Sequence, residues 1–263
     1  MTTSIIDQLP TLLVFVAGTL LAAAAATGLH ALILPRLPHD LLEQHNPVSG
    51  VIMTVIGTLY AVVLGFAVVV VWQQFNTAAD LSNSEADALA DVYRLSSGLP
   101  EPKRGKIRLT IRAYADSVLY REWPEMNHEG RSDPHTQQLA LAVAHEVDGI
   151  QPATPAATNL QAAALSALVI FLDSRRDRLT YLDSRIPAVL WYALIAGGLT
   201  TLGFTFLFGL RSTRLQLLMT AGLAGMIAMS LIAINELDSP LEGDTHVQPT
   251  AWQLFEAQIG QIR

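Results

Sequence analysis

Four long stretches of the chain contain no charged residue and are mostly apolar, and polar segments separate them. They are Leu12–Leu34, Val51–Trp72, Ile186–Leu210 and Leu215–Ile234, of 23, 22, 25 and 20 residues. A helix rises about 1.5 Å per residue, so each stretch can cross a hydrocarbon core about 30 Å thick. An ionised side chain at the bilayer centre costs about 2.5–3.5 kcal/mol, which explains why charges are missing here. The pattern predicts four transmembrane helices.

The composition is ordinary once these stretches are set aside. Only 15% of the 263 residues are charged, whereas soluble domains have about 25%. The four stretches total 90 residues, and the other 173 hold all 16 basic and 23 acidic residues. Four buried core helices of a soluble protein would need far more covering chain. A soluble enzyme, a nucleic-acid-binding protein and a disulfide-stapled secreted domain are excluded as leading interpretations, and the absence of cysteine excludes thiol chemistry.

The first stretch is predicted to be retained as a span. No Lys or Arg precedes Arg36, so the basic region of a signal peptide is missing, and the apolar run is too long for one. Four crossings put both termini on the same membrane side as Gln73–Arg185, with Pro35–Gly50 and Arg211–Arg214 on the other.

Basic residues near the spans give conflicting predictions of orientation. They are Arg36, Arg211 and Arg214 in the short connections, and Arg175, Arg176, Arg178 and Arg185 before the third stretch. Short loops count most in the rule that places basic residues in the cytoplasm, but four arginines beside one span argue the opposite. The charges leave the orientation open.

The second span is predicted to continue beyond the membrane as one helix. No proline occurs between Val51 and Gly98, and Pro100 and Pro102 then end the helix. About 48 residues at 1.5 Å each make a rod of roughly 70 Å. Apolar residues recur at helical steps along its second half: Ala78, Leu81, Ala88, Val92 and Leu95.

Further helices are predicted in the middle segment. They cover Pro102–Trp123, His135–Asp148 and Thr158–Arg185, with breaks at Glu125–Pro134 and Gln151–Pro155. The last helix is expected to run into the third span, with Pro187 in its first turn. Trp252, Phe255, Ile259 and Ile262 share one face of a C-terminal helix that docks on this bundle or lies at the membrane surface.

The fold class is therefore an all-α membrane protein with four transmembrane helices and a helical extramembrane bundle formed by extensions of the second and third spans. The predicted segments are a first transmembrane pair (1–72, with spans 12–34 and 51–72), an extramembrane segment (73–185), a second transmembrane pair (186–234, with spans 186–210 and 215–234), and an acidic turn with an amphipathic helix (235–263).

The second span has two distinctive ridges. Gly57, Ala61 and Gly65 are spaced four apart and predict close helix packing. Thr58, Val62 and Phe66 form a second ridge, about a quarter turn away. This second ridge can face another helix, lipid or a pore.

Few residues suggest other chemistry. His30 is the only imidazole inside a span, and ionisable groups in membranes are functional candidates. After the fourth span, Asp238, Glu242 and Asp244 lie in an acidic turn. Oxygen ligands of this kind can bind calcium, although the order is not that of an EF-hand and a capped, solvated turn is the alternative. The chain has no Gly-rich phosphate loop and no serine elbow, so nothing indicates an enzyme.

Several short segments resemble a bacterial and plant membrane family of unknown function that is labelled bestrophin-like. In chain order they are Ala61–Phe66, Trp72–Phe75, Glu85-Ala86, Arg175–Leu179, Ile186-Pro187 with Trp191, Phe206–Gly209, and Leu237–Gly243 with Val247 and Pro249. They extend from the second span to the C-terminal region in the order that the family shows.

The resemblance extends further, to the bestrophin anion channels, and implies a function. Bestrophins are pentamers whose second span lines a hydrophobic neck through a Val-Leu-Gly-Phe segment, which Val63–Phe66 resembles. By position, Thr58, Val62 and Phe66 are the inward residues. Bestrophins keep both termini and the middle segment in the cytoplasm. Their calcium clasp has a Pro-Phe-Gly-acidic run, and Ser239–Asp244 is shorter and less acidic.

The resemblance thus implies a homo-oligomeric ion channel, with a pentamer favoured, in the bacterial inner membrane. The implied partners are the lipid bilayer and inorganic anions, and nucleic acid is not among them. No cofactor is expected, apart from calcium at the acidic turn. An apolar neck favours weakly hydrated anions because they lose water more easily, and the ring edge of Phe66 carries partial positive charge.

Two other functions stay open. The first is a membrane-anchored helical sensor or scaffold without channel activity, although only about 29 residues follow the fourth span. A transporter is expected to have broken helices in matching halves, and only Gly197-Gly198 hints at this.

Overall fold

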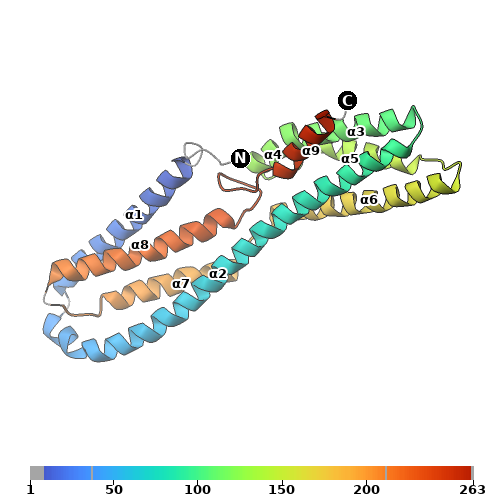
Figure 1. The fold of residues 1–263 in the computed structure, drawn as a ribbon. Coiled ribbons are helices and arrows are strands. Elements are labelled where there is room, and N and C mark those ends of the chain that lie inside the picture. The colour runs from blue at the N-terminus through green and yellow to red at the C-terminus, as the bar shows by residue number, and fades with distance from the viewer. Residues whose placement is uncertain (1–8, 37, 211, 262–263) are drawn as a thin grey trace. The chain divides into compact units, whose positions relative to one another are not determined.

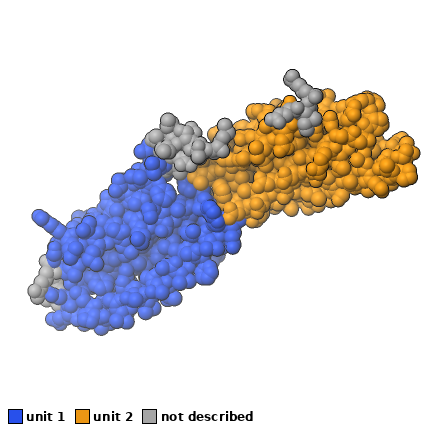
Figure 2. Space-filling view, viewed as in Figure 1, with its two compact units in different colours: residues 1–73, 185–238 blue, residues 74–184, 239–263 orange. Residues whose placement is uncertain are grey.

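The structure is a computed structural model that describes residues 9–36, 38–210 and 212–261, apart from the side chains of 9–11, 39–41 and 261. Every regular element in this part of the chain is a helix (Figure 1). The chain divides into two compact units (Figure 2). Unit 1 comprises residues 1–73 and 185–238, and unit 2 comprises residues 74–184 and 239–263.

Unit 1 contains the four apolar stretches as helices. These are α1 (Leu9–Ile33), followed by the short η1 (Leu34–Arg36), the first part of α2 (His39–Leu95), α7 (Ala188–Thr205) and α8 (Thr213–Leu237). Large apolar side chains are exposed on all four, including Leu21, Phe66, Val189 and Leu218. Such surfaces suit lipid or another protein chain rather than water.

Helix α2 begins at His39, so the prediction of a connection over Pro35–Gly50 is wrong for most of its length. The helix includes Pro47 near its start. The Asn46 amide donates to the Gly209 carbonyl over 2.8 Å and accepts from the Gly209 N–H over 3.1 Å. This pair of hydrogen bonds to the α7–α8 connection holds the first turns of α2. The contact joins residues far apart in the sequence, so no local sequence pattern predicts it.

Close packing in unit 1 depends on small residues. Helix α1 lies beside α8 (Figure 1), and a Cβ at Gly18 would lie 2.8 Å from Ile232 Cδ1. On α7, a Cβ at Gly197 would lie 2.5 Å from Tyr60 Cδ2, and one at Gly198 would lie 2.9 Å from the Tyr60 hydroxyl. The paired glycines therefore make room for a ring of α2. Helix α7 continues unbroken through both.

Unit 2 is a bundle of the remaining helices. They are the second part of α2, η2 (Ser96–Gly98), α3 (Lys103–Ser117), the π-helical turn η3 (Val118–Glu122), α4 (Trp123–Glu129), α5 (Pro134–Asp148), α6 (Pro155–Thr180), η4 (Tyr181–Asp183) and α9 (Thr250–Gln261). Their apolar faces enclose one core that includes Leu89, Ile111, Met126, Phe171 and Trp252.

Most predicted helices of unit 2 are confirmed. Helix α2 continues to Leu95 and the chain leaves it before Pro100, while α5 ends at Asp148 as expected. The predicted loop Glu125–Pro134 is shorter, because α4 continues to Glu129 and ends at Gly130 with φ 61°. Trp252, Phe255 and Ile259 are buried, so α9 docks on the bundle; Ile262 lies outside the described residues.

Helix α6 does not run into the third span as predicted. It ends at Thr180, and residues 184–187 are not helical. A residue before proline avoids the helical conformation, and the Ile186 N–H donates over 2.6 Å to Asp238 Oδ1 instead of to a helical carbonyl. The extension of the second span is therefore continuous, whereas that of the third span is interrupted.

Five helices of the described chain are long and apolar enough to cross a membrane by length and composition, one more than the four predicted. The additional one is α6. Its buried stripe packs into the core of unit 2 and contains Ala164, Ala167, Leu168 and Phe171. An Ala-rich core helix and a membrane span share this composition, which is why hydropathy alone does not separate them.

Replacing Gly197 by alanine is expected to destabilise unit 1. The added methyl overlaps the Tyr60 ring, and overpacking of this kind costs about 1–3 kcal/mol. Thermal unfolding in detergent micelles measures the effect. Gly203→Ala is the matched control, because it lies on the same helix and its Cβ would meet no atom within 4 Å. Equal midpoints for the two variants would contradict the packing of Tyr60 on α7.

Candidate functional site

The first part of α2 has one buried face and one uncovered face. Tyr60, Ala67 and Val71 are buried against the rest of unit 1. Val62 is 50% exposed and Phe66 is 68% exposed, and Thr58 is exposed as well. The three residues predicted to face a pore therefore point away from the chain's own helices.

The small-residue ridge is also open in the single chain. A Cβ at Gly57 or at Gly65 would meet no atom within 4 Å, and Ala61 is exposed. No described residue of the same chain packs closely on these glycines. Packing of another helix on Gly57, Ala61 and Gly65 stays a prediction.

The acidic turn has a structural role at its first residue. Asp238 Oδ1 accepts from the Ile186 N–H, and Oδ2 accepts from Trp191 Nε1 over 3.3 Å. The carboxylate thus joins the end of α8 to the beginning of α7. Both of its oxygens are engaged by N–H donors, which disfavours a role as a calcium ligand.

The remaining acidic residues do not complete a metal site. The Glu242 carboxylate lies against Gly130, where a Cβ would overlap it. Among the described residues, no three His, Asp or Glu side chains are grouped as metal ligands. Asp238, Glu242 and Asp244 are thus not gathered as a three-residue cluster, and calcium binding by them stays a prediction.

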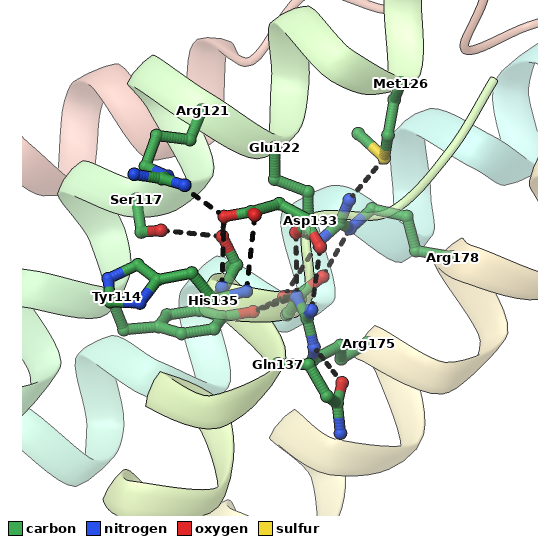
Figure 3. A network of polar contacts seen from close by, with 12 residues as sticks. Tyr114, Ser117, Arg121, Glu122, Met126, Asp133, His135, Gln137, Arg175 and Arg178 are labelled. Atoms are coloured by element: carbon green, nitrogen blue, oxygen red, sulfur yellow. Dashed lines mark hydrogen bonds and ion pairs between the residues drawn. The ribbon is translucent and has the colours of Figure 1, made fainter. Parts of the chain in front are cut away.

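Unit 2 contains a buried network of charged residues (Figure 3). Arg178 of α6 donates from Nε to Glu85 Oε2 of α2 over 2.5 Å, and from Nη2 to Glu122 Oε2 over 3.0 Å. Arg175 binds both oxygens of Glu122 over 2.7 and 2.8 Å. The Tyr114 hydroxyl accepts from Arg175 over 2.7 Å and donates to Glu85. The network connects α2, α3, η3 and α6.

The network is electrically balanced and excluded from water. Glu85, Glu122 and Arg178 are 0% exposed, and Arg175 is 2% exposed. Burial alone would raise the pKa of Glu122, but Arg178 and the hydrogen bonds from Arg175 lower it below its usual value. Two arginines and two glutamates cancel in charge, and bidentate pairing satisfies the guanidinium forks. Removing one member leaves its partner charged in a dry core.

A second polar cluster fixes the start of α5 (Figure 3). Asp133 accepts from the backbone N–H groups of His135 and Thr136, from the Thr136 hydroxyl and from Arg121. Burial opposes ionisation of Asp133, but the bonds from Thr136 and Arg121 outweigh it and lower the pKa to about 2. The cluster is a helix cap with a neighbouring cation rather than a reactive group.

Arg175 and Arg178 have a role that differs from the predicted one. Their position before the third stretch predicts basic residues at a membrane edge, but both are ion-paired inside unit 2. The spacing of residues on α6 could have revealed this role. Arg178 lies seven residues after Phe171 and four residues before Leu182, so the arginine occupies a core position on the apolar stripe of α6. A charge at such a position requires a buried partner.

Glu85→Ala is expected to destabilise unit 2 strongly. It leaves Arg178 without its closest partner, and breaking a buried pair costs about 3–5 kcal/mol. Tryptophan fluorescence during unfolding in micelles measures the loss, since Arg178 lies 5.4 Å from the Trp123 ring centroid. Asp91→Ala is the control on the same helix, because its pair with Arg94 is exposed. A similar small loss for both variants would contradict the network's importance.

Comparisons with known proteins agree with this architecture. The family model described as Bestrophin-like domain matches residues 20–252. The crystal structure of a membrane protein is similar with a TM-score of 0.66 and 14% identity, covering 94% of this chain and 98% of that chain. The crystal structure of a mutated bacterial bestrophin homologue from Klebsiella pneumoniae has a TM-score of 0.65 and 14% identity, with 95% and 98% covered.

Curated proteins give no match. At 14% identity the two crystal structures show the shared fold, and the family model covers most of the sequence. With its long apolar helices, the chain is an integral membrane protein that belongs to the Bestrophin-like domain family.

Proposed function

We propose that the chain is a subunit of a bestrophin-like, oligomeric ion channel in the bacterial inner membrane, with the first part of α2 lining the ion path. The observation that carries the proposal is the uncovered face of α2. A helix that faces only lipid does not need two different ridges, whereas a helix in a ring needs one face for its neighbour and another for the axis.

The four helices of unit 1 are the proposed spans. Helix α6 is assigned to the extramembrane unit although its composition allows a span. Its last two turns contain Arg175 and Arg178, whose partners come from other helices of unit 2. A bilayer-spanning α6 would take this network out of the helical bundle that satisfies it.

Assembly would use the two ridges of α2 for different contacts. At 3.6 residues per turn, Gly57, Ala61 and Gly65 lie on one flank of the face that contains Thr58 and Val62. Small residues allow the α2 helix of a neighbouring copy to approach closely. The adjoining face would then surround the axis, and five copies are favoured by the family resemblance.

The proposed neck contains Thr58, Val62 and Phe66 and no ionised group. An apolar constriction resists ions through the cost of removing their water. Weakly hydrated anions lose water more readily, so anion conduction is the first expectation.

Cation conduction is the second candidate, and charges on α2 favour it. Asp80 follows Val62 by 18 residues and Asp87 follows Val69 by 18, which is five helical turns. Both carboxylates are exposed, and neither has an ion-pair partner among the described residues. Repeated around an axis, they would attract cations and repel anions.

Val62→Ala combined with Phe66→Ala is expected to raise single-channel conductance and loosen selectivity, because smaller side chains widen the neck and retain water. Planar-bilayer recording of purified protein measures both quantities. Val189→Ala with Leu199→Ala is the matched control, since these exposed apolar residues lie on α7. Unchanged conductance would remove α2 from the path. No current from a protein that binds a ligand would instead favour the membrane-anchored sensor or scaffold.

Asp80→Asn combined with Asp87→Asn tests the sign of the conducted ion. If cations pass, the reversal potential in a potassium chloride gradient moves toward the chloride equilibrium potential when these charges are removed. Asp148→Asn with Asp183→Asn changes the net charge equally at other exposed positions and is expected to leave the potential unchanged. If the native protein reverses at the chloride equilibrium potential and neither pair of substitutions changes that potential, the channel conducts anions.

A further inference from the structure

His30 is a polar residue in the mostly apolar helix α1, and it is completely buried within unit 1. Its Nδ1 lies 2.8 Å from Thr220 Oγ1, and its Nε2 lies 3.2 Å from Gln216 Nε2. Its ring centroid lies 4.4 Å from that of Phe206, and the two rings are tilted by 38°. Both α8 and the α7–α8 connection therefore contact this imidazole, which has no part in the proposed neck.

The hydrogen bonds define one tautomer. The Thr220 hydroxyl donates to the Gln216 carbonyl over 3.1 Å, so it is free to accept the proton of His30 Nδ1. The Gln216 amide N–H₂ faces Nε2, which must then be the unprotonated acceptor. The site as built holds a neutral histidine.

Gln216 links this histidine to the α7–α8 connection. Its Nε2 also donates to the Phe208 carbonyl over 2.6 Å. Its Oε1 has no hydrogen-bond partner although the residue is only 2% exposed. Reversing the amide would place Oε1 against the Phe208 carbonyl, so two acceptors would face each other. With a neutral histidine, no new hydrogen bond to Oε1 would offset this repulsion. A buried acceptor thus lies unused beside the imidazole.

We propose that His30 is a proton-binding site that controls the hold of Gln216 on the α7–α8 connection. A proton added to the Nε2 lone pair places an N–H against the Gln216 N–H₂, two donors without an acceptor. Rotation of the amide brings Oε1 to the new N–H and satisfies both groups. The Phe208 carbonyl then loses its donor, and the two bonds of the Asn46–Gly209 pair are the side-chain hydrogen bonds that remain on residues 206–210 among those that the structure describes.

No charged group competes for this proton in the described structure. The ring's polar contacts are uncharged. Of the ionisable side chains described on the elements of unit 1, Tyr60 of α2 is buried against Gly197 and Gly198, and Glu236 at the end of α8 is half-buried. The others are exposed: Arg36, Glu43, His45, Tyr192 and Arg214. The response to pH therefore depends on the Gln216 exchange rather than on an ion pair. The inference concerns unit 1 alone and does not depend on conduction.

The absence of cysteine allows a direct test. Leu207→Cys introduces a single thiol at an exposed position beside Phe208, and its labelling rate by a charged maleimide is followed from pH 8 to pH 5. Each rate is divided by that of the same protein with His30→Gln, which removes the intrinsic pH dependence of the thiol. We expect this ratio to rise about fivefold at low pH, as for the loss of one hydrogen bond.

Two further variants complete the test. Gln216→Leu removes the donor to Phe208 and is expected to give the fast rate at every pH. His45→Gln replaces an exposed histidine of the same unit and is expected to keep the native pH response. A ratio that stays flat overturns the proposal. If His30→Gln does not fold, the labelling rates of Gln216→Leu are divided by those of His45→Gln instead. The proposal is then overturned if Gln216→Leu keeps the native pH response, so that this ratio stays flat.

Discussion

The pairing of two buried arginines with two buried glutamates is the interaction on which unit 2 depends. Glu85 comes from α2, Glu122 from η3, and both arginines from α6, so elements distant in sequence must be correctly placed together before any charge is satisfied. Hydrophobic packing alone tolerates alternative arrangements of similar volume. A guanidinium fork in a dry core does not, because an unpaired charge there is costly. The network therefore fixes the register of α2 against the bundle, which is the same helix that presents the uncovered apolar face in unit 1.

Helix α2 has an apolar exposed surface in unit 1 and a more polar, acidic one in unit 2. Between Val51 and Trp72 its exposed side chains are mostly apolar, such as Val62 and Phe66, whereas in unit 2 its exposed positions include Asp80 and Asp87. The buried stripe continues through both parts, with Ala67 and Val71 followed by Ala78 and Leu89. Apart from Glu85, whose charge is paired with Arg178, the buried side stays apolar or uncharged, and the change from apolar to acidic occurs on the outward side. This is the pattern expected when a helix leaves a hydrocarbon environment while keeping a protein-facing side.

Local sequence signals predicted the helices well and the buried polar contacts poorly. Charge-free length identified α1, α7 and α8, and the absence of proline after Val51 identified the long part of α2, because both effects act within one element. The turns of α2 around Pro47 were missed. The interruption between α6 and α7 was missed, since it depends on Asp238 accepting from the Ile186 N–H across 52 residues. The π-helical turn η3, which positions Glu122, likewise has no local signature. The outward faces of α2 were predicted as candidates, but the sequence could not tell which residues the chain itself would cover; the uncovered state of Val62 and Phe66 is information from the fold.

In the proposed channel, the apolar neck and the acidic residues of α2 would select ions by different physics. Dehydration in a narrow apolar passage depends on how strongly an ion holds its water and changes little with salt. Attraction by exposed carboxylates depends on the sign of the ion and is screened within about 10 Å at 0.1 M ionic strength. Asp80 and Asp87 are exposed, so their influence must weaken as salt rises, whereas that of Phe66 must persist. A selectivity that reverses or fades with ionic strength is therefore governed by the carboxylates, and one that stays constant is governed by the neck.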